Sequence, residues 1–360
     1  MKVLLLIGGG RSGIDLMQSL FDQHPNISQF PGIFRWGEFF KKLINEKDSN
    51  QILNIFFKDY NLFFNSKLNL RERHDQLGEN KDEHYVIDKE KFKTFFLEMI
   101  KRRGNLDKKN ILECLHLSYS LASNENIEKK KIIVINIHTL DFLSEFETFD
   151  YEILYTIRHP IASLSSGIKH WLEYDKGKHV SPWSIFFHID RQFNALKKII
   201  STNKKVHVIK LERLHRNSDE VLRGLCIKLN ISYLDKLKIS SYHGKKWWGD
   251  ALSKKYLNGL NKNFSNKIDS NFFFKKDIYL LEFYLSKLFE KYDYEKTSLN
   301  NKKNTFFLNL IPLKVELNIL KRELIKLNFI NVIFSFYFYF KRIYLFFLSN
   351  FNNTNFPKSY

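Results

Sequence analysis

Residues 3–15 read VLLLIGGGRSGID, and this stretch decides the fold class. Its first five residues form a continuous apolar run of strand length, which is typical of a strand covered on both faces. Three glycines follow at once, and a helical pattern then runs from Gly13 to Gln23. A buried strand, a glycine-rich turn and a helix in this order predict the first unit of an α/β fold.

The same rhythm of strand and helix recurs three more times before residue 230. The sequence predicts further strands at Ile132–Ile137, Tyr151–Ile157 and Val206–Leu211, followed by helices at Asp141–Thr148, Ile161–Tyr174 and Ser218–Leu229. Residues 34–124 show polar-faced helical patterns and no clear strand. We therefore predict a mainly parallel sheet in three layers, with a helical insertion at about residues 34–124.

Length and composition indicate one large domain with an appendage. The 360 residues are 44% hydrophobic and 27% charged, which is near the globular average and excludes a wholly disordered chain. Six prolines and two cysteines exclude a collagenous or disulfide-framed protein. We predict a main domain over residues 1–298 and a basic, aromatic-rich helical extension over residues 299–360.

The C-terminal extension has a helical pattern of its own. Its leucines at 313, 317, 320, 324 and 327 predict one apolar stripe on a helix that starts just after Pro312. An aromatic run follows at residues 329–340, but Lys341 and Arg342 interrupt it before it reaches the roughly 20 residues of a bilayer span. We expect the extension to pack on the main domain or on a second copy, and peripheral contact with a membrane surface is the alternative.

The net charge of +19 favours an anionic partner, either a phosphorylated or sulfated small molecule or an anionic lipid. Nucleic acid is not expected, because the lysines are scattered along the chain and form no single stripe. The apolar run at Met1–Ile7 is too short for the core of a signal peptide. We therefore expect a cytoplasmic protein, with peripheral attachment to the inner membrane face as the alternative that the extension leaves open.

The glycine-rich turn predicts an anion-binding loop, because successive backbone N–H groups there converge at the start of a helix. Gly8, Gly10 and Gly13 satisfy the dinucleotide pattern G-x-G-x-x-G, but no acidic residue ends a second strand about 20 residues later. The P-loop spacing is also present, yet Ile14 and Asp15 replace the lysine and the hydroxyl residue of that motif. What remains is a phosphate cradle whose positive charge comes from Arg11 and not from a metal.

Two segments resemble the sulfotransferase family. Residues 10–13, GRSG, are followed by Leu16, Leu20 and the pair His24-Pro25, and this run is similar to the 5'-phosphosulfate loop of that family. Further along, Arg158 directly follows a predicted strand and Ser166 comes eight residues later on a predicted helix, which is the spacing of the family's second motif. The resemblance covers residues 1–292 and implies a P-loop-like three-layer α/β fold.

The resemblance also implies the co-substrate, 3'-phosphoadenosine 5'-phosphosulfate, with no metal. The residues it implies for binding are Gly10, Arg11, Ser12, Gly13, Ile14 and Asp15 around the phosphosulfate, Arg158 and Ser166 at the 3'-phosphate, and Lys245, Lys246 and Trp247 in a closing loop. Ile14 and Asp15 depart from the family, which has two threonines there.

The implied reaction moves a sulfuryl group to a hydroxyl or amine, with a carbohydrate or envelope glycan as the expected acceptor. Arg11 would stabilise the leaving phosphate, and the candidates for general base are His138, Glu38 and Asp15. Two alternatives stay open. One is an NAD- or FAD-dependent oxidoreductase that uses the glycine turn, and the other is a non-enzymatic protein that binds polyanions or a membrane surface.

Overall fold

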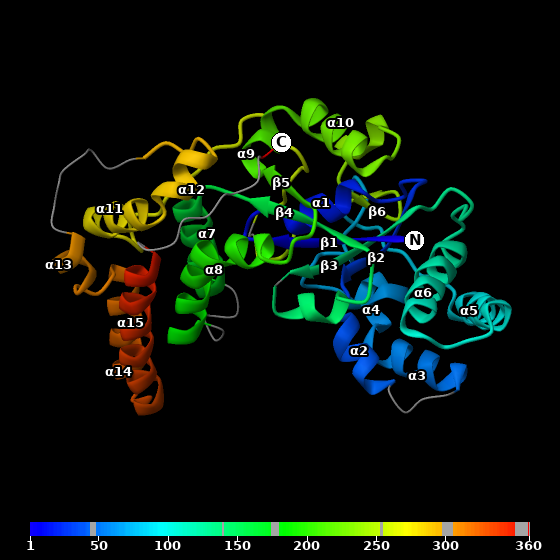
Figure 1. Ribbon diagram of the computed structural model, residues 1–360, viewed down its shortest axis with the longest axis horizontal. Helices are drawn as coiled ribbons and strands as arrows, with labels where there is room; N and C mark the ends of the chain where they lie inside the picture. The colour runs from blue at the N-terminus through cyan, green and yellow to red at the C-terminus, as the bar shows by residue number, and fades with distance from the viewer. Residues whose placement is uncertain are drawn as a thin grey trace.

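The computed structural model describes residues 1–43, 48–138, 140–173, 180–252, 255–296, 305–349 and 359. Its centre is a five-stranded sheet in the order β2-β3-β1-β4-β5, and every pairing in it is parallel (Figure 1). The strands are β1 (Lys2–Gly8), β2 (Ile27–Ile33), β3 (Ile132–His138), β4 (Tyr151–Ile157) and β5 (Val206–Lys210). The predicted α/β fold with a parallel sheet is confirmed.

Helices cover both faces of this sheet. On one face lie α1 (Ile14–Leu20), α9 (Leu211–Arg216) and α10 (Ser218–Leu229). On the other lie α6 (Lys108–Ala122), α7 (Pro160–Glu173), α8 (Pro182–Ile200) and the 3-10 helix η2 (Leu140–Phe146). The segment 141–148, expected as an α-helix, is therefore a 3-10 helix that ends at residue 146.

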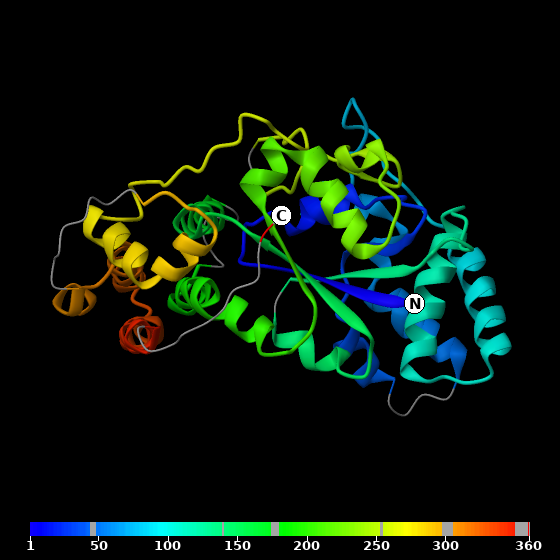
Figure 2. The ribbon, with the colours of Figure 1, turned by 45° about the horizontal axis from the view of Figure 1, so that its top comes forward.

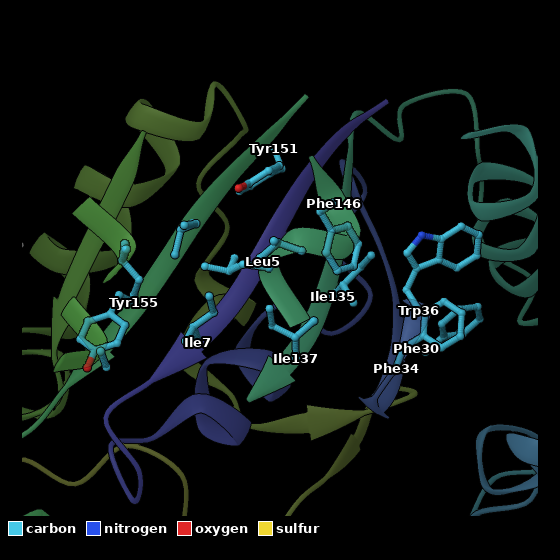
Figure 3. Close-up of a cluster of buried hydrophobic side chains, with 14 of the residues drawn as sticks. Leu5, Ile7, Phe30, Phe34, Trp36, Ile135, Ile137, Phe146, Tyr151 and Tyr155 are labelled. Atoms are coloured by element: carbon cyan, nitrogen blue, oxygen red, sulfur yellow. The ribbon is translucent and has the colours of Figure 1, made fainter. Parts of the chain in front are cut away.

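Alternate residues of β1 belong to two separate cores, as a strand covered on both faces requires. Leu5 and Ile7 join one apolar cluster, whereas Leu4 and Leu6 join the other. Figure 3 shows the first cluster, where Leu5 lies beside Ile135 of β3 and Ile7 beside Ile137.

The edge strand β2 was not expected from the sequence, because Pro31 and Gly32 interrupt the apolar pattern that predicts a strand. Proline is tolerated at a sheet edge, where one side of the strand needs no ladder hydrogen bond. Its pairing with β3 is irregular between Gln29 and Ile33, the stretch that contains both residues.

The insertion and the C-terminal helices lie at opposite ends of the sheet (Figure 2). The insertion contains α2 (Trp36–Lys42), α3 (Ser49–Asp59), α4 (Asn61–Phe64), the 3-10 helix η1 (Ser66–Leu68) and α5 (Lys89–Arg103), and it ends with α6. After α10 come the 3-10 helix η4 (Asp235–Lys238), the two-residue strands β6 (Ser241–Tyr242) and β7 (Lys245–Lys246), and the helices α11 (Lys275–Tyr284), α12 (Ser286–Lys291), α13 (Thr305–Asn309), α14 (Lys314–Ile325) and α15 (Phe329–Ser349).

The prediction that the leucine stripe of α14 packs against the rest of the protein is wrong. Leu313 is buried, but Leu317, Leu324 and Leu327 are exposed. The helix instead buries Val315 and Ile319, which lie between the leucines. Helix α15 is long and apolar enough to cross a membrane over Phe329–Leu348, although charged residues 341 and 342 interrupt its apolar run.

Strand β1 lies between β3 and β4 in the sheet. From β1 the chain runs through α1, β2 and the insertion to β3 on one side of β1, and it then crosses to β4 on the other side. Such a switch of direction opens a crevice at the carboxyl ends of the central strands, which is where open α/β sheets bind ligands. The glycine loop after β1, His138 at the end of β3 and Arg158 after β4 all lie at this edge.

Candidate functional site

The loop between β1 and α1 is held through its carbonyl groups. The side chain of Gln192 on α8 donates to the carbonyl oxygen of Gly9, and the Ser163 hydroxyl on α7 donates to that of Gly10. Within the described residues, the N–H groups of residues 10–14 have no backbone acceptor. Convergent N–H groups of this kind form a concavity for an anion.

The loop needs glycine at position 10 for two reasons. Gly10 has a φ of +85°, a left-handed conformation that side chains disfavour. A Cβ atom there would also lie 2.4 Å from Cε1 of His188. Arg11 follows with a φ of +43°, so its backbone is also in the left-handed region. The loop therefore brings its backbone against α8 and directs Arg11 into the adjoining cavity.

A cavity of about 260 Å³ joins the loop to the end of β4, and Arg11 and Arg158 both line it. Nη1 of Arg158 lies 3.4 Å from the carbonyl oxygen of Arg11, and its Nε lies 3.3 Å from Oδ1 of Asn266. The guanidinium also lies 5.3 Å from the ring centre of Phe264. Burial lowers the pKa of Arg158 to about 10, which still leaves the group charged at neutral pH.

Arg11 is paired with an acid in this arrangement. Its Nη1 donates to Oδ2 of Asp250 at 2.7 Å, and both side chains are mostly buried. Asp250 lies three residues after Trp247, which lines the same cavity and donates its indole N–H to the carbonyl of Glu72. An incoming anion at Arg11 therefore has to share the guanidinium with Asp250 or displace it.

The end of β3 pairs with the first turn of α1. Nε2 of His138 lies 3.0 Å from Oδ1 of Asp15, and the Asn136 amide donates to the same oxygen at 3.1 Å. Burial raises the pKa of Asp15, but the facing His138 and the hydrogen bonds outweigh burial and leave the pKa below its usual range. Asp15 is thus an ionised acceptor, which makes it a weak general base.

Glu72 is a site residue that the sequence did not indicate. It lies in the irregular stretch between η1 and α5, and its carboxylate reaches the cavity beside Asp15 and Asp250. Burial, followed by the charges of these two acids, raises the pKa of Glu72 to about 8. A carboxyl group with a pKa near physiological pH is suited to general acid–base work.

The cluster could also hold a cation, because oxygen atoms of Asp15, Glu72 and Asp250 lie within 4.8 Å of one another. Arg11 and His138 already occupy oxygen atoms of two of these acids. Acidic clusters of this size are common without a metal, so the expected absence of a metal requirement stays a prediction.

His188 is a second residue that the sequence did not indicate. It lines the cavity, is 1% exposed, and neither ring nitrogen has a hydrogen-bond partner among the described residues. Burial lowers its pKa to about 3, so the ring is neutral at physiological pH. A buried imidazole without a hydrogen-bond partner lowers the stability of the folded state. A ligand in this cavity could supply the missing hydrogen bond.

A second cavity of about 680 Å³ adjoins the first, and Asp15, Arg71 and Glu72 line both. Its other walls combine aromatic side chains with charged ones, among them Phe39, Tyr60, Phe63, Tyr242, Arg35, Lys42 and Asp59. The two cavities meet at Glu72, so a group bound in one lies next to a group bound in the other.

Four of the residues expected in the site lie outside the first cavity. Lys245 and Lys246, which the loop was expected to turn toward the ligand, instead pair with Glu83 and Glu79 of the insertion. Ser166 is half-buried on α7 and does not line the cavity, whereas Ser163 of the same helix contacts the loop.

The fourth is Glu38, which is exposed and pairs with Arg35 at 3.1 Å. It lines the second cavity and not the first. The remaining expected residues, which are Gly10, Arg11, Ser12, Gly13, Ile14, Asp15, His138, Arg158 and Trp247, all line the first cavity.

Comparisons with solved structures find sulfotransferases among the matches. The chain is similar to the sulfotransferase domain from the Synechococcus PCC 7002 olefin synthase, with 12% identity and a TM-score of 0.44, over 81% of this chain and 94% of that one. It is similar to the sulfotransferase domain from the curacin biosynthetic pathway, with 15% identity and a TM-score of 0.38, over 85% and 95% of the two chains. Sulfotransferase STF9 from Mycobacterium avium has 12% identity and a TM-score of 0.33, over 65% of each chain. No protein-family model and no curated protein matches the chain.

Proposed function

We propose that the chain is a sulfotransferase that moves a sulfuryl group from 3'-phosphoadenosine 5'-phosphosulfate to a hydroxyl or amine. One observation carries the proposal. The glycine loop after β1 and Arg158 after β4, which are 147 residues apart in sequence, meet at one cavity with Nη1 of Arg158 3.4 Å from the carbonyl of Arg11. A donor that carries anionic groups at two places needs two such separate binding points.

In this proposal the loop and Arg11 bind the phosphosulfate, and Arg158 binds the 3'-phosphate. Guanidinium suits phosphate because its N–H groups match two phosphate oxygens at once. Phe264, beside Arg158, and Trp247 are two of the aromatic side chains of this cavity that could pack against the adenine. The unpartnered nitrogens of His188 would gain a contact from the same ligand.

The transfer step forms a bond between the acceptor oxygen, or nitrogen, and the sulfur. It breaks the bond from sulfur to the bridging oxygen of the 5'-phosphate, and 3',5'-adenosine bisphosphate leaves with that electron pair. The acceptor proton passes to a general base, and no oxidant or reductant takes part. Positioning and stabilisation of charge on the leaving phosphate are most of the catalytic task in such loose in-line transfers.

We assign the general base to Glu72, and keep His138 as the second candidate. Glu72 stands where the two cavities meet, and its raised pKa matches the protonation change that the step requires. Asp15 is a weaker base because its pKa is lowered. Replacing a general base by an amide is expected to lower kcat by about 10² to 10⁴ while donor binding persists.

The second cavity is the proposed acceptor site, and a carbohydrate is the class of acceptor it fits best. Aromatic faces such as those of Tyr60 and Phe63 can pack on the C–H faces of a sugar ring. Charged side chains on the same walls, Arg35 and Asp59 among them, can bind its hydroxyl groups. Glu38 then belongs to the acceptor side.

The strand order weighs against the dinucleotide alternative. In that fold the strand after the first helix lies beside the first strand and ends in the acid that binds the ribose. Here β2 lies at the sheet edge with β3 between it and β1, and β2 ends at Ile33. The glycine spacing is therefore present without the strand that would complete a dinucleotide site.

The test is ligand protection followed by transfer. We expect 3',5'-adenosine bisphosphate to raise the Tm, with no need for Mg²⁺, and NAD to leave it unchanged. Arg158→Ala should abolish the shift, whereas the exposed control Arg102→Ala should keep it. Incubation with donor labelled at sulfur should then label a carbohydrate acceptor.

Protection by NAD without protection by the bisphosphate would overturn the proposal in favour of the oxidoreductase. Protection that appears only with Mg²⁺ would overturn the metal-free site and point to the cluster of Asp15, Glu72 and Asp250. Bisphosphate protection without transfer to any hydroxyl or amine would leave a nucleotide-binding protein and refute the transferase.

A further inference from the structure

The hairpin formed by α14 and α15 carries apolar side chains on its outside. At its tip, residues 325–333, five large side chains are each 67–73% exposed: Ile325, Leu327, Phe329, Ile330 and Ile333. Exposed apolar residues continue along both helices with Leu317, Leu324, Phe334, Phe336, Tyr337 and Phe340. Figure 1 shows the hairpin projecting away from the sheet. Continuous apolar patches of this extent are rare on monomeric soluble proteins and mark an interaction surface.

The inside of the same hairpin combines apolar side chains, Val315, Ile319 and Phe346 among them, with buried charged groups. Arg342 is 0% exposed, and it donates to Glu316 at 3.0 Å and to Oδ1 of Asn309 at 2.6 Å. Glu323 is 2% exposed and accepts hydrogen bonds from Arg322 and Asn331. A helical hairpin in water places such groups outside and its leucines inside. Here several large apolar side chains are outside and two ionic groups are fully paired inside, which suits apolar surroundings because polar groups there must be satisfied within the protein.

The exposed charges of the segment have one sign. Lys321, Lys326 and Lys341 are exposed, whereas the two acids of residues 305–349 are the internal Glu316 and Glu323. An apolar tip bordered by lysines complements a bilayer with anionic head groups, because the lysines remain at the head groups while the tip enters the acyl region.

The charges around the tip favour a bilayer over a second copy. Two tips packed against each other would bring the lysines of both copies together, with no exposed acid on residues 305–349 to pair with them. We do not propose that α15 spans the bilayer, because four residues of its C-terminal half, Arg342, Ile343, Leu345 and Phe346, are buried against the rest of the protein. Phe346 lies 4.9 Å from the ring centre of Phe193 on α8 and 4.5 Å from that of Tyr284 on α11.

We propose that the tip of the α14–α15 hairpin inserts into the interfacial layer of an anionic lipid bilayer and holds the protein at the membrane surface. The apolar side chains of residues 325–333 enter the lipid, and the ammonium groups of Lys321 and Lys326 remain at the head groups. The depth is that of an interfacial helix, about 5–10 Å.

The experiment is co-sedimentation of the full chain with vesicles of phosphatidylcholine alone or with about one quarter phosphatidylglycerol. We expect binding to the anionic vesicles that weakens with salt. Leu327→Glu/Ile330→Glu/Ile333→Glu should reduce the bound fraction at least about tenfold, because three apolar side chains no longer enter the lipid. The matched control is Ile227→Glu on α10, an apolar residue that is 77% exposed elsewhere, and it should bind as the unchanged protein does.

Depth gives a second readout that does not depend on loss of binding. Ile333→Trp should show a blue-shifted emission on anionic vesicles and quenching by lipids brominated near the head group. Far-UV circular dichroism of each variant checks that the hairpin is folded. No binding by the unchanged protein, or equal binding by the triple variant, would overturn the proposal. So would a dimer that the triple variant converts to a monomer without any vesicle binding, which would assign the tip to a second copy of the chain.

Discussion

Glu72→Gln gives the sharpest test of the site's electrostatics. Burial and two neighbouring acids raise the pKa of Glu72 from 4.5 to about 8. Between these two values the folded state holds a proton that the unfolded state has released, so the contribution of Glu72 to stability falls as pH rises. Glutamine keeps the shape and cannot ionise. The variant should therefore match the unchanged protein near pH 5 and become the more stable of the two near pH 9.

The size of the effect follows from the pKa and the exposure. A pKa moved from 4.5 to about 8 corresponds to at most about 5 kcal/mol of unfolding free energy. The Glu72 side chain is 25% exposed, and Asp15 and Asp250 adjust their own charge as it ionises, so we expect about 1–2 kcal/mol. For a chain of this length that is about 1–3 °C in Tm.

The assay is a series of thermal melts from pH 5 to pH 9 without ligand. The difference between the two melting temperatures should grow in favour of Glu72→Gln across this range. The matched control is Glu79→Gln, an acid of the same insertion that is 76% exposed and pairs with Lys246. If the curves of the unchanged protein and Glu72→Gln run parallel at every pH, Glu72 does not titrate near 8 and loses its assignment as base.

Three further predictions concern other parts of the chain. Gly10→Ala should lower the Tm by several degrees and abolish protection by the bisphosphate, whereas Gly104→Ala, with a similar positive φ but nothing within 4 Å of the new Cβ, should cost about 1 kcal/mol and leave protection intact. Asp250→Asn should tighten bisphosphate binding about three- to tenfold in a calorimetric titration, because the Arg11 guanidinium loses its ion pair with the Asp250 carboxylate and is free to bind the phosphate. Weaker binding would show that the carboxylate is needed to orient Arg11. Arg342→Met should cost about 3–5 kcal/mol in urea unfolding by leaving Glu316 without its partner, and adding Glu316→Gln should recover part of that loss.

The parallel sheet could be predicted because its strands are covered on both faces and therefore read as continuous apolar runs. Val3–Ile7 and Tyr151–Ile157 have that pattern, and both are strands. The edge strand β2 could not be found in this way, since Pro31 and Gly32 interrupt its pattern at a place where the sheet tolerates them. The leucines of α14 misled for a different reason, because regular spacing identifies a helix face without saying whether water or protein lies against it.

The site residues also differ in how far the sequence could predict them. Arg11 and Arg158 could be predicted because each follows a strand of the sheet directly, and adjacent parallel strands bring their carboxyl ends together. Glu72 lies in a stretch without periodic pattern, and its position depends on how the whole insertion folds back on the sheet. The pairing of Lys245 and Lys246 with acids of that insertion depends on the same long-range packing.

The geometry of α1 accounts for the two residues that depart from the sulfotransferase pattern. Ile14 is 4% exposed and packs in the apolar cluster beneath α1, so an apolar side chain at this position contributes to the core. Asp15 points to the other side, where His138 and Asn136 at the end of β3 engage its Oδ1 atom. The acid is therefore bound by the neighbouring strand and accepts no hydrogen bond from the N–H groups of residues 10–14. An acid next to an anion-binding loop is compatible with that loop when a second strand holds its oxygen, and the pairing with His138 accounts in this way for Asp15.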